Sequence, residues 1–232
     1  MIDLYELAGA DPSVRFSPYC WRVRMALAHK GVKARLLPWH FGDRKLPGGH
    51  RQVPVMVDDG RVIADSTAIA FHLEHKYSNG PSLFGGDGGE AHARFIIAWA
   101  DGVLNPALLG VVAPDLIHLV RPDARPEFRA ARERRLGMSF EQAFERRPAM
   151  IEAARHAMQP LRRVLKDADF LGGEEPSYAD YAVFGSLQWV RCSSQAALFE
   201  ATDVVALWQD RMLDLFGEFA RGAVRAADHE VA

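Results

Sequence analysis

The sequence has few cysteines and no long uninterrupted apolar segment. Two cysteines in 232 residues, Cys20 and Cys192, are too few for the disulfide framework of a small secreted domain, so the expected compartment is the reducing cytoplasm. The first residues contain no basic segment followed by an apolar one, and no signal peptide is predicted. The most apolar stretch, residues 95–120, is interrupted by Asp101, Asn105 and prolines. This argues against a membrane span and predicts a buried helix that is kinked or broken at the prolines.

The chain also lacks a strong charge of either sign and the residue spacing of common cofactor sites. With 28 basic and 30 acidic residues the net charge is −2, which gives no electrostatic basis for a nucleic acid or an anionic membrane as partner. The histidines are scattered without metal-ligand spacing, and no glycine-rich phosphate loop follows a strand. Neither a metal ion nor a nucleotide is therefore expected.

The first part of the chain has the pattern of an α/β unit. Apolar runs at residues 2–7 and 34–39 predict two strands, and a helix from Pro18 to about Lys30 lies between them. Because a helical crossover joins strands that run in the same direction, the two strands are expected to be parallel. For the polar segment 41–52 the sequence leaves open a short helix or a loop.

A hairpin and a helix are predicted next. Residues 53–64 form two β-branched runs around Asp59-Gly60, which favours a tight antiparallel turn. Asp65-Ser66 then provides a helix start, with apolar residues at spacing four behind it. The order β-α-β, loop, β-β-α is that of a thioredoxin-like domain.

The rest of the chain is predicted to be helical. Residues 78–89 contain five glycines and one proline, which indicates a linker. Beyond it no β-branched alternation remains, and Ser177 and Asp180 have the spacing of a capping box. The expected organisation is a thioredoxin-like domain (1–79), a linker (80–89) and an all-α domain (90–232). Helices are expected at residues 90–118 with breaks, 126–136, 150–166, 178 to about 195, and 203–219.

The segment Ser17-Pro18-Tyr19-Cys20 combines a helix start with a chemical motif. Ser17 suits the N-cap, and Pro18 suits the first helical position. Backbone N–H groups and the helix dipole at such an end stabilise an anion, for example a thiolate. The segment has the outline of a Cys-x-x-Cys redox motif in which serine replaces the first cysteine. This favours a hydroxyl that holds a thiolate carried by a ligand, and the alternative is that Ser17 is only a helix cap.

In its architecture and motifs the chain resembles the cytosolic glutathione transferases over nearly its whole length. Residues 17–22 resemble the active-site segment of the serine-type bacterial β-aryl etherases and their fungal etherase-like relatives, and residues 17–27 are also similar to the zeta class. Both similarities place the catalytic serine at Ser17. The segments 171–173 and 177–181 are closer to the etherase-like branch.

The resemblance implies glutathione as co-substrate and assigns further ligand positions. Val53-Pro54 matches the family's Val-Pro, whose proline is cis and whose valine backbone pairs with the cysteinyl part of glutathione. Asp65 and Ser66 match the residues that hold the γ-glutamyl ammonium and carboxylate. Gln52 stands where the zeta class has a glutamine that reaches the peptide. Taken alone, Asp65-Ser66 would indicate an ordinary helix cap and Pro54 the start of a strand.

The sequence leaves two parts of the site unassigned. The loop 41–51 is short for the family, and the sequence does not rank His40, Lys45 and Arg51 as partners of the glycyl carboxylate of glutathione. Phe16, Cys20 and Trp99 are candidate walls of the second-substrate pocket, although core packing is the alternative role of each. The Cys20 thiol is either a reactive group with a lowered pKa at the first helical turn or an inert buried cysteine.

The expected function is a glutathione transferase in which Ser17 activates the thiolate for attack on an apolar, aromatic electrophile, by conjugation or β-aryl ether cleavage. A zeta-like isomerase of conjugated diacids is an alternative, for which Arg15 or Arg22 could bind the carboxylates. A non-catalytic protein that binds glutathione or apolar ligands is a second alternative. The resemblance also implies a homodimer.

Overall fold

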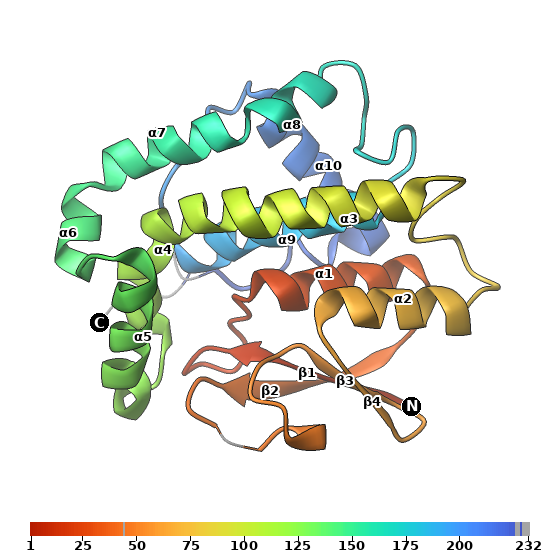
Figure 1. Cartoon of the computed structure of the whole chain (residues 1–232), viewed down its shortest axis with the longest axis horizontal. Helices are drawn as coiled ribbons and strands as arrows, with labels where there is room; N and C mark the ends of the chain where they lie inside the picture. Colours follow the sequence, from red (N-terminus) through yellow and green to blue (C-terminus); the bar gives the residue numbers. More distant parts are fainter. Residues whose placement is uncertain (44, 226–227, 229–232) are drawn as a thin grey trace.

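The computed structural model describes residues 1–43, 45–225 and 228, and the expected domain end at residue 232 lies outside the described residues. It combines a thioredoxin-like α/β layer with an all-helical part that lies over the two helices of that layer (Figure 1). The predicted fold class is therefore confirmed.

A four-stranded mixed sheet forms the base of the molecule. Its strands are β1 (Ile2–Ala8), β2 (Ala34–His40), β3 (Val55–Asp58) and β4 (Arg61–Ala64) in the spatial order β2-β1-β3-β4. Strand β1 is parallel to β2, while β3 is antiparallel to both β1 and β4. The predicted parallel pair and the predicted hairpin are both present.

Helices α1 (Pro18–His29) and α2 (Ser66–Lys76) lie side by side between the sheet and the C-terminal helices (Figure 1). Most residues of α1 are buried because the sheet contacts one of its sides and the helical part contacts another. For the segment 41–52 the sequence leaves the conformation open; its described residues, 41–43 and 45–52, form a loop with one 3-10 turn, η1 (Pro47–Gly49).

A single helical run of 31 residues opens the C-terminal part. It consists of α3 (Gly89–Trp99), a π-helical turn η2 (Ala100–Leu104) and α4 (Asn105–Leu119). The expected break before Pro106 is a π turn and not an interruption of the helical run, because Pro106 falls in the first turn of α4. Pro114 lies inside α4 without ending it. By length and composition the run could cross a membrane, and 44% of its most apolar window is buried in the fold.

The remaining helical part differs from the prediction in two places. Residues 150–166 were expected to form one helix but belong to two, separated at Met158, because Pro160 starts a new helix. The short helix at residues 140–145 was not predicted. The elements are η3 (Pro122–Ala124), α5 (Arg125–Leu136), α6 (Phe140–Glu145), α7 (Arg147–Ala157), α8 (Gln159–Val164), α9 (Tyr178–Ser193) and α10 (Val204–Glu218).

The predicted capping box starts the central helix α9. Ser177 and Asp180 exchange the two reciprocal bonds of that motif. The buried Asp180 carboxylate also accepts from the Leu171 N–H at 2.7 Å, the Gly172 N–H at 3.0 Å and the Trp208 indole at 3.1 Å. One carboxylate therefore joins the start of α9 to the preceding loop and to α10.

Close packing of α1 on α9 holds the two parts of the chain together. Gly185 lies so near α1 that a Cβ at this position would be 2.3 Å from the Pro18 carbonyl oxygen. From α1, the Arg22 Nε donates to the Ala182 carbonyl at 3.2 Å. The α9 backbone therefore fixes the first turn of α1.

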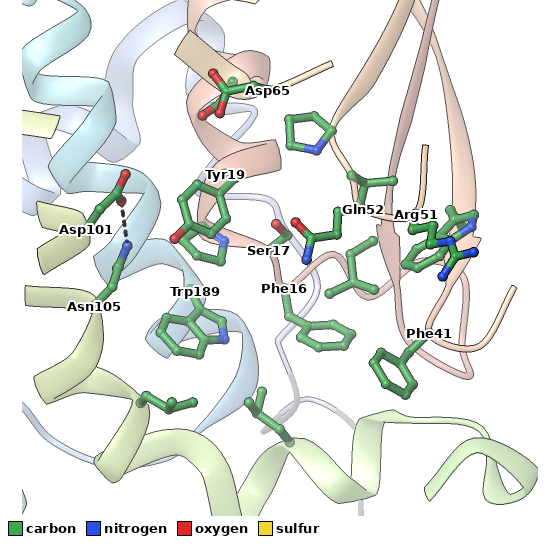
Figure 2. Close-up of a pocket in the computed structure, with 18 of the residues that line it drawn as sticks. Phe16, Ser17, Tyr19, Phe41, Arg51, Gln52, Asp65, Asp101, Asn105 and Trp189 are labelled. Atoms are coloured by element: carbon green, nitrogen blue, oxygen red, sulfur yellow. Dashed lines mark hydrogen bonds between the residues drawn. The ribbon is translucent and has the colours of Figure 1, made fainter. Parts of the chain in front are cut away.

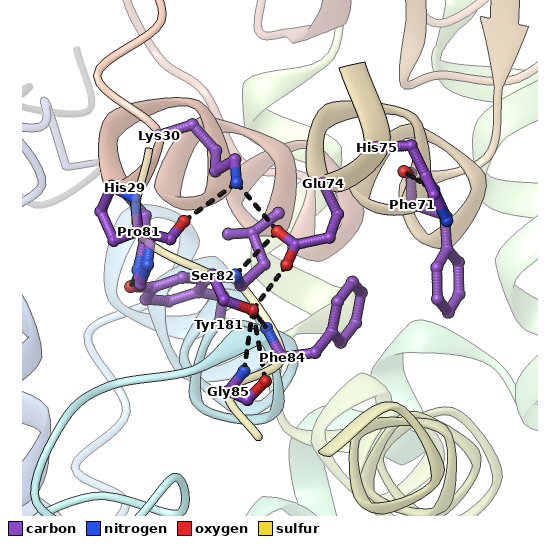
Figure 3. Close-up of polar contacts among 11 residues, drawn as sticks. His29, Lys30, Phe71, Glu74, His75, Pro81, Ser82, Phe84, Gly85 and Tyr181 are labelled. Carbon is purple, nitrogen blue, oxygen red and sulfur yellow. Dashed lines mark hydrogen bonds and ion pairs between the residues drawn. The ribbon is translucent and has the colours of Figure 1, made fainter. Parts of the chain in front are cut away.

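A second polar contact region joins the two parts near the end of α1 (Figure 3). The buried Lys30 ammonium donates to the Glu74 carboxylate and to the Pro81 carbonyl, both at 2.9 Å. The His29 Nδ1 lies 2.5 Å from the Tyr181 hydroxyl of α9. Burial lowers the pKa of His29, which favours the neutral ring in this contact.

Candidate active site

A cleft of about 860 Å³ lies where the loops after β1 and β2 face the helical part (Figure 2). Its walls come from both parts of the chain. The cleft brings together all the predicted glutathione-contacting residues, which are Ser17, Gln52, Val53, Pro54, Asp65 and Ser66.

Ser17 is the N-cap of α1 and also lines this cleft. Its backbone is extended (φ −97°, ψ 125°), and its Oγ accepts from the Cys20 N–H at 3.3 Å. Because that bond uses a lone pair of Oγ, the hydroxyl proton remains for a donor role. The side chain is nearly buried, with 4% of its surface exposed, so an anion beside it would be largely shielded from water. The capping role and the ligand role are compatible.

Gln52, Val53 and Pro54 form the neighbouring wall (Figure 2). The Val53–Pro54 peptide bond is cis, as the resemblance implies. The last residues before β3 and the N-terminus of α1 line the same cleft.

Asp65 and Ser66 occupy the start of α2 on the same cleft. Asp65 has φ +79°, a conformation that is rare outside glycine and is often found at functional sites. Its Oδ1 accepts from the Thr67 N–H at 2.8 Å and the Ala68 N–H at 3.0 Å, so Oδ2 is left for a ligand ammonium. The buried Tyr178 hydroxyl of α9 donates to the Ser66 carbonyl at 2.7 Å. The helical part thereby holds the start of α2 in position.

The apolar wall differs from the prediction. Phe16 lines the cleft, but Cys20 and Trp99 do not. Cys20 is 1% exposed in the core, and burial raises the pKa of its thiol to about 12, which favours the inert alternative. Trp99 is at the end of α3 and packs partly buried against the core. The aromatic residues that line the cleft are Phe16, Tyr19, Trp39, Phe41, Phe128 and Trp189.

An ion pair between the buried Arg22 and the partly exposed Asp101 lies at one side of the cleft. The Arg22 guanidinium, fully buried, contacts the Asp101 carboxylate at 2.7 Å and lies 4.8 Å from the centre of the Tyr19 ring. The Asn105 amide donates to the same carboxylate at 3.0 Å (Figure 2). Asp101 belongs to the π turn, a type of irregularity that is frequent at functional sites. The pair neutralises a carboxylate that faces the cleft.

Several cleft residues were missed by sequence reasoning. Asp101 and Asn105 stand out as polar residues spaced by four in an apolar run, and this spacing could have indicated one helix face that meets a polar site. Phe41, Phe128 and Trp189 gave no such signal, because each resembles an ordinary core aromatic. Of the three cationic candidates for the glycyl carboxylate, only Arg51 lines the cleft, and His50 accompanies it.

The described residues contain no group of three or more His, Cys, Asp or Glu side chains that could hold a metal ion.

Comparison with known proteins identifies the family. The family model for the N-terminal domain of glutathione S-transferases matches residues 12–82, and a model for the C-terminal domain matches residues 91–221. A probable glutathione S-transferase of Glycine max is 27% identical over 179 residues, which are 75% of this chain and 68% of the relative. A probable glutathione S-transferase of Oryza sativa subsp. japonica is 25% identical over 214 residues, covering 84% and 80% of the two chains.

Solved structures agree with this result. The crystal structure of a glutathione S-transferase of Ceriporiopsis subvermispora in complex with glutathione superposes with a TM-score of 0.79 at 25% identity, covering 93% of this chain and 96% of that one. Glutaredoxin 2 of Salmonella typhimurium, in complex with glutathione, shares the fold at 19% identity with a TM-score of 0.71, covering 97% and 99%. With both family domains matched in order along the sequence, the chain belongs to the glutathione S-transferase family of transferases.

Proposed function

We propose that the chain binds glutathione along the cleft and that Ser17 activates its thiol. The observation that carries the proposal is that Ser17, at the start of α1, faces the same cleft as the cis Val53–Pro54 bond and the Asp65-Ser66 pair at the start of α2. In this arrangement the Val53 backbone pairs with the cysteinyl part. Asp65 receives the γ-glutamyl ammonium, and the Ser66 hydroxyl with the α2 N-terminus receives the carboxylate.

The free energy needed to lower the pKa of the bound thiol is modest. A free thiol has a pKa of roughly 8.5, and lowering it by one to two units takes about 1.4 to 2.7 kcal/mol of differential stabilisation of the thiolate. A charge-assisted hydrogen bond from the Ser17 hydroxyl contributes about 1.5 to 3 kcal/mol. The N-terminal dipole of α1 adds to that bond. Ser17 and its helix can therefore supply the stabilisation that raises the thiolate from a few per cent to roughly a quarter to three quarters of the bound thiol at pH 7.

The aromatic walls favour an aryl electrophile as second substrate. Phe41, which packs edge to face on the buried Phe128 with ring centres 5.0 Å apart, and Trp189 form an aromatic wall of the cleft for a second ring beside the thiolate. In β-aryl ether cleavage the thiolate would form a C–S bond to the ether carbon while the C–O bond breaks and the aryloxide leaves. In conjugation the leaving group is a different anion, and the roles of the residues are unchanged.

Residues 1–79 then serve as the glutathione-binding domain, with the linker at 80–89, and the helical domain that begins at residue 90 provides the second-substrate pocket.

The zeta-like isomerase is less well supported, because its expected cationic residues are engaged elsewhere. Arg15 contacts the buried Glu6 carboxylate at 2.7 Å, and Arg22 contacts Asp101 at the same distance. Neither Arg15 nor Arg22 is among the residues that line the cleft.

An ultraviolet difference titration of the protein with glutathione tests the activation step. We expect a thiolate band of the bound ligand at pH 7, and the band should disappear only as the pH is lowered towards 6. Binding of glutathione without any such band would contradict serine activation and favour the non-catalytic alternative. Assays with aryl ethers, aryl halides and conjugated diacids then separate the reactions, because only the isomerase leaves the glutathione concentration unchanged.

We also propose a homodimer, as the family resemblance implies. Phe95 of α3 is 72% exposed and Val103 of the π turn is 48% exposed, although both belong to a largely apolar helical run. A second copy covering this run would remove these side chains from water. Light scattering should give twice the monomer mass, and Phe95→Glu should lower the apparent mass at the same concentration. A monomeric mass for the unmodified protein at micromolar concentration would contradict the proposal.

A further inference from the structure

Arg132 of α5 is a cation placed among the aromatic residues of the cleft. Its guanidinium carbon lies 4.6 Å from the centre of the Phe128 ring and 5.8 Å from that of Phe41. The Phe41 and Phe128 rings meet edge to face. Arg132 lines the cleft together with Arg135, one helical turn further along α5. The second-substrate side of the cleft therefore combines aromatic faces with positive charge.

The Arg132 guanidinium has no carboxylate partner within 4 Å and no hydrogen bond among the residues that the structure describes. Arg129, on the same helix, contacts Glu133 at 2.9 Å and also Glu141. Burial and the neighbouring Arg135 lower the pKa of Arg132, which means that its charged form is under-stabilised here. A half-buried cation without an anion is costly, and a ligand anion would remove that cost.

We propose that Arg132, assisted by Arg135, binds an anionic group of the second substrate, so that the enzyme acts on aromatic electrophiles bearing a carboxylate. The proposal rests on the proposed function, because it concerns the co-substrate of the same cleft. Cation–π contact with the two rings fixes the guanidinium, while its N–H groups remain for bidentate binding of the carboxylate.

Glutathione itself offers a carboxylate of the same chemistry, on its glycyl residue. Arg51 and His50 lie on the loop that leads to Val53, beside the proposed glutathione peptide, whereas Arg132 comes from the helical domain. This placement favours the second substrate as the ligand of Arg132. An experiment must therefore vary the two carboxylates separately.

The test measures binding of two unreactive probes of nearly equal shape, 3,5-dinitrobenzoate and 3,5-dinitrobenzamide, by calorimetry. The protein is first saturated with S-methylglutathione, which has no thiol. We expect the unmodified protein to bind the acid at least about tenfold more tightly than the amide, and Arg132→Met to remove this preference while keeping the amide affinity. The matched control is Arg134→Met, an exposed position of the same helix outside the cleft lining, which should keep the preference.

Two outcomes would overturn the proposal. One is equal binding of acid and amide by the unmodified protein. The other is an Arg132→Met variant that keeps the acid preference but loses affinity for S-methylglutathione, which would assign Arg132 to the glycyl carboxylate. Because neither probe reacts, the result does not depend on whether Ser17 activates a thiol.

An activity measurement complements the binding test. The reactive pair is 4-chloro-3,5-dinitrobenzoate and its amide, in which the thiolate forms a C–S bond and chloride leaves with the electrons of the C–Cl bond. Arg132→Met should lower the ratio of kcat/KM for acid over amide about tenfold. An equal decrease for both probes would indicate general damage to the site and contradict the proposal.

Discussion

Ser17→Ala is expected to abolish the thiolate band of bound glutathione at pH 7 and to lower kcat/KM for an aryl electrophile about a hundredfold, the effect of removing one donor to a reacting anion. The helix dipole and the remaining contacts are unaffected, so glutathione should still bind. The measurement is the ultraviolet difference titration across pH, run beside the unmodified protein. Ser17→Ala also removes the N-cap bond of α1, at a cost of about 1 kcal/mol, so the melting temperature must be recorded as well.

Cys20→Ala is the matched control for this prediction. Cys20 lies three residues from Ser17 and its side chain contacts that of Ser17, but its thiol is buried, with a pKa raised to about 12 that keeps it protonated. The thiolate band should therefore persist in Cys20→Ala. If the band survived Ser17→Ala and disappeared in Cys20→Ala, the assignment of the activating group would be wrong.

Gly185→Ala is expected to lower the melting temperature by about 10 °C, which corresponds to about 3 kcal/mol, the upper end of the overpacking effect. The added Cβ would lie 2.3 Å from the Pro18 carbonyl oxygen, a backbone atom that cannot rotate away. Helices α1 and α9 must then separate. Because Ser17 precedes this turn of α1, the affinity for glutathione should fall as well. Thermal unfolding and calorimetry with S-methylglutathione measure the two effects.

Gly110→Ala provides the comparison within another buried helix. Its added Cβ would lie 2.7 Å from the Met150 sulfur, the far end of a flexible side chain. The stability change should stay within about 1 kcal/mol, since alanine also favours the helix. If Gly185→Ala and Gly110→Ala lowered the free energy of unfolding equally, the α1–α9 contact would be no more rigid than the contact at Gly110.

Local signals explain why most of the thioredoxin-like domain could be predicted. The Asp59-Gly60 turn and the serine-proline helix start each depend on neighbours in sequence, and both are present in the structure. The resemblance supplied the cis Val53–Pro54 bond, for which the sequence alone suggested only the start of a strand.

The side of the cleft formed by the helical part could not be predicted in the same way. Trp189 and Phe128 reach the cleft only through the packing of helices distant in sequence. The direction of the Cys20 side chain depends on which side of α1 meets the sheet, and the first helical turn alone does not decide this. The first of the two helices ends at Met158, inside an apolar pattern that is otherwise continuous. The sequence pattern therefore predicts one helix where the structure has two.

The burial of both cysteines has a consequence for the chemical durability of the molecule. Thiol–disulfide exchange requires an accessible thiolate, and burial raises the pKa of Cys20 and of Cys192 to about 12. When oxidised glutathione accumulates, the folded chain therefore offers no ready site for a mixed disulfide, even in the first turn of the helix that Ser17 caps.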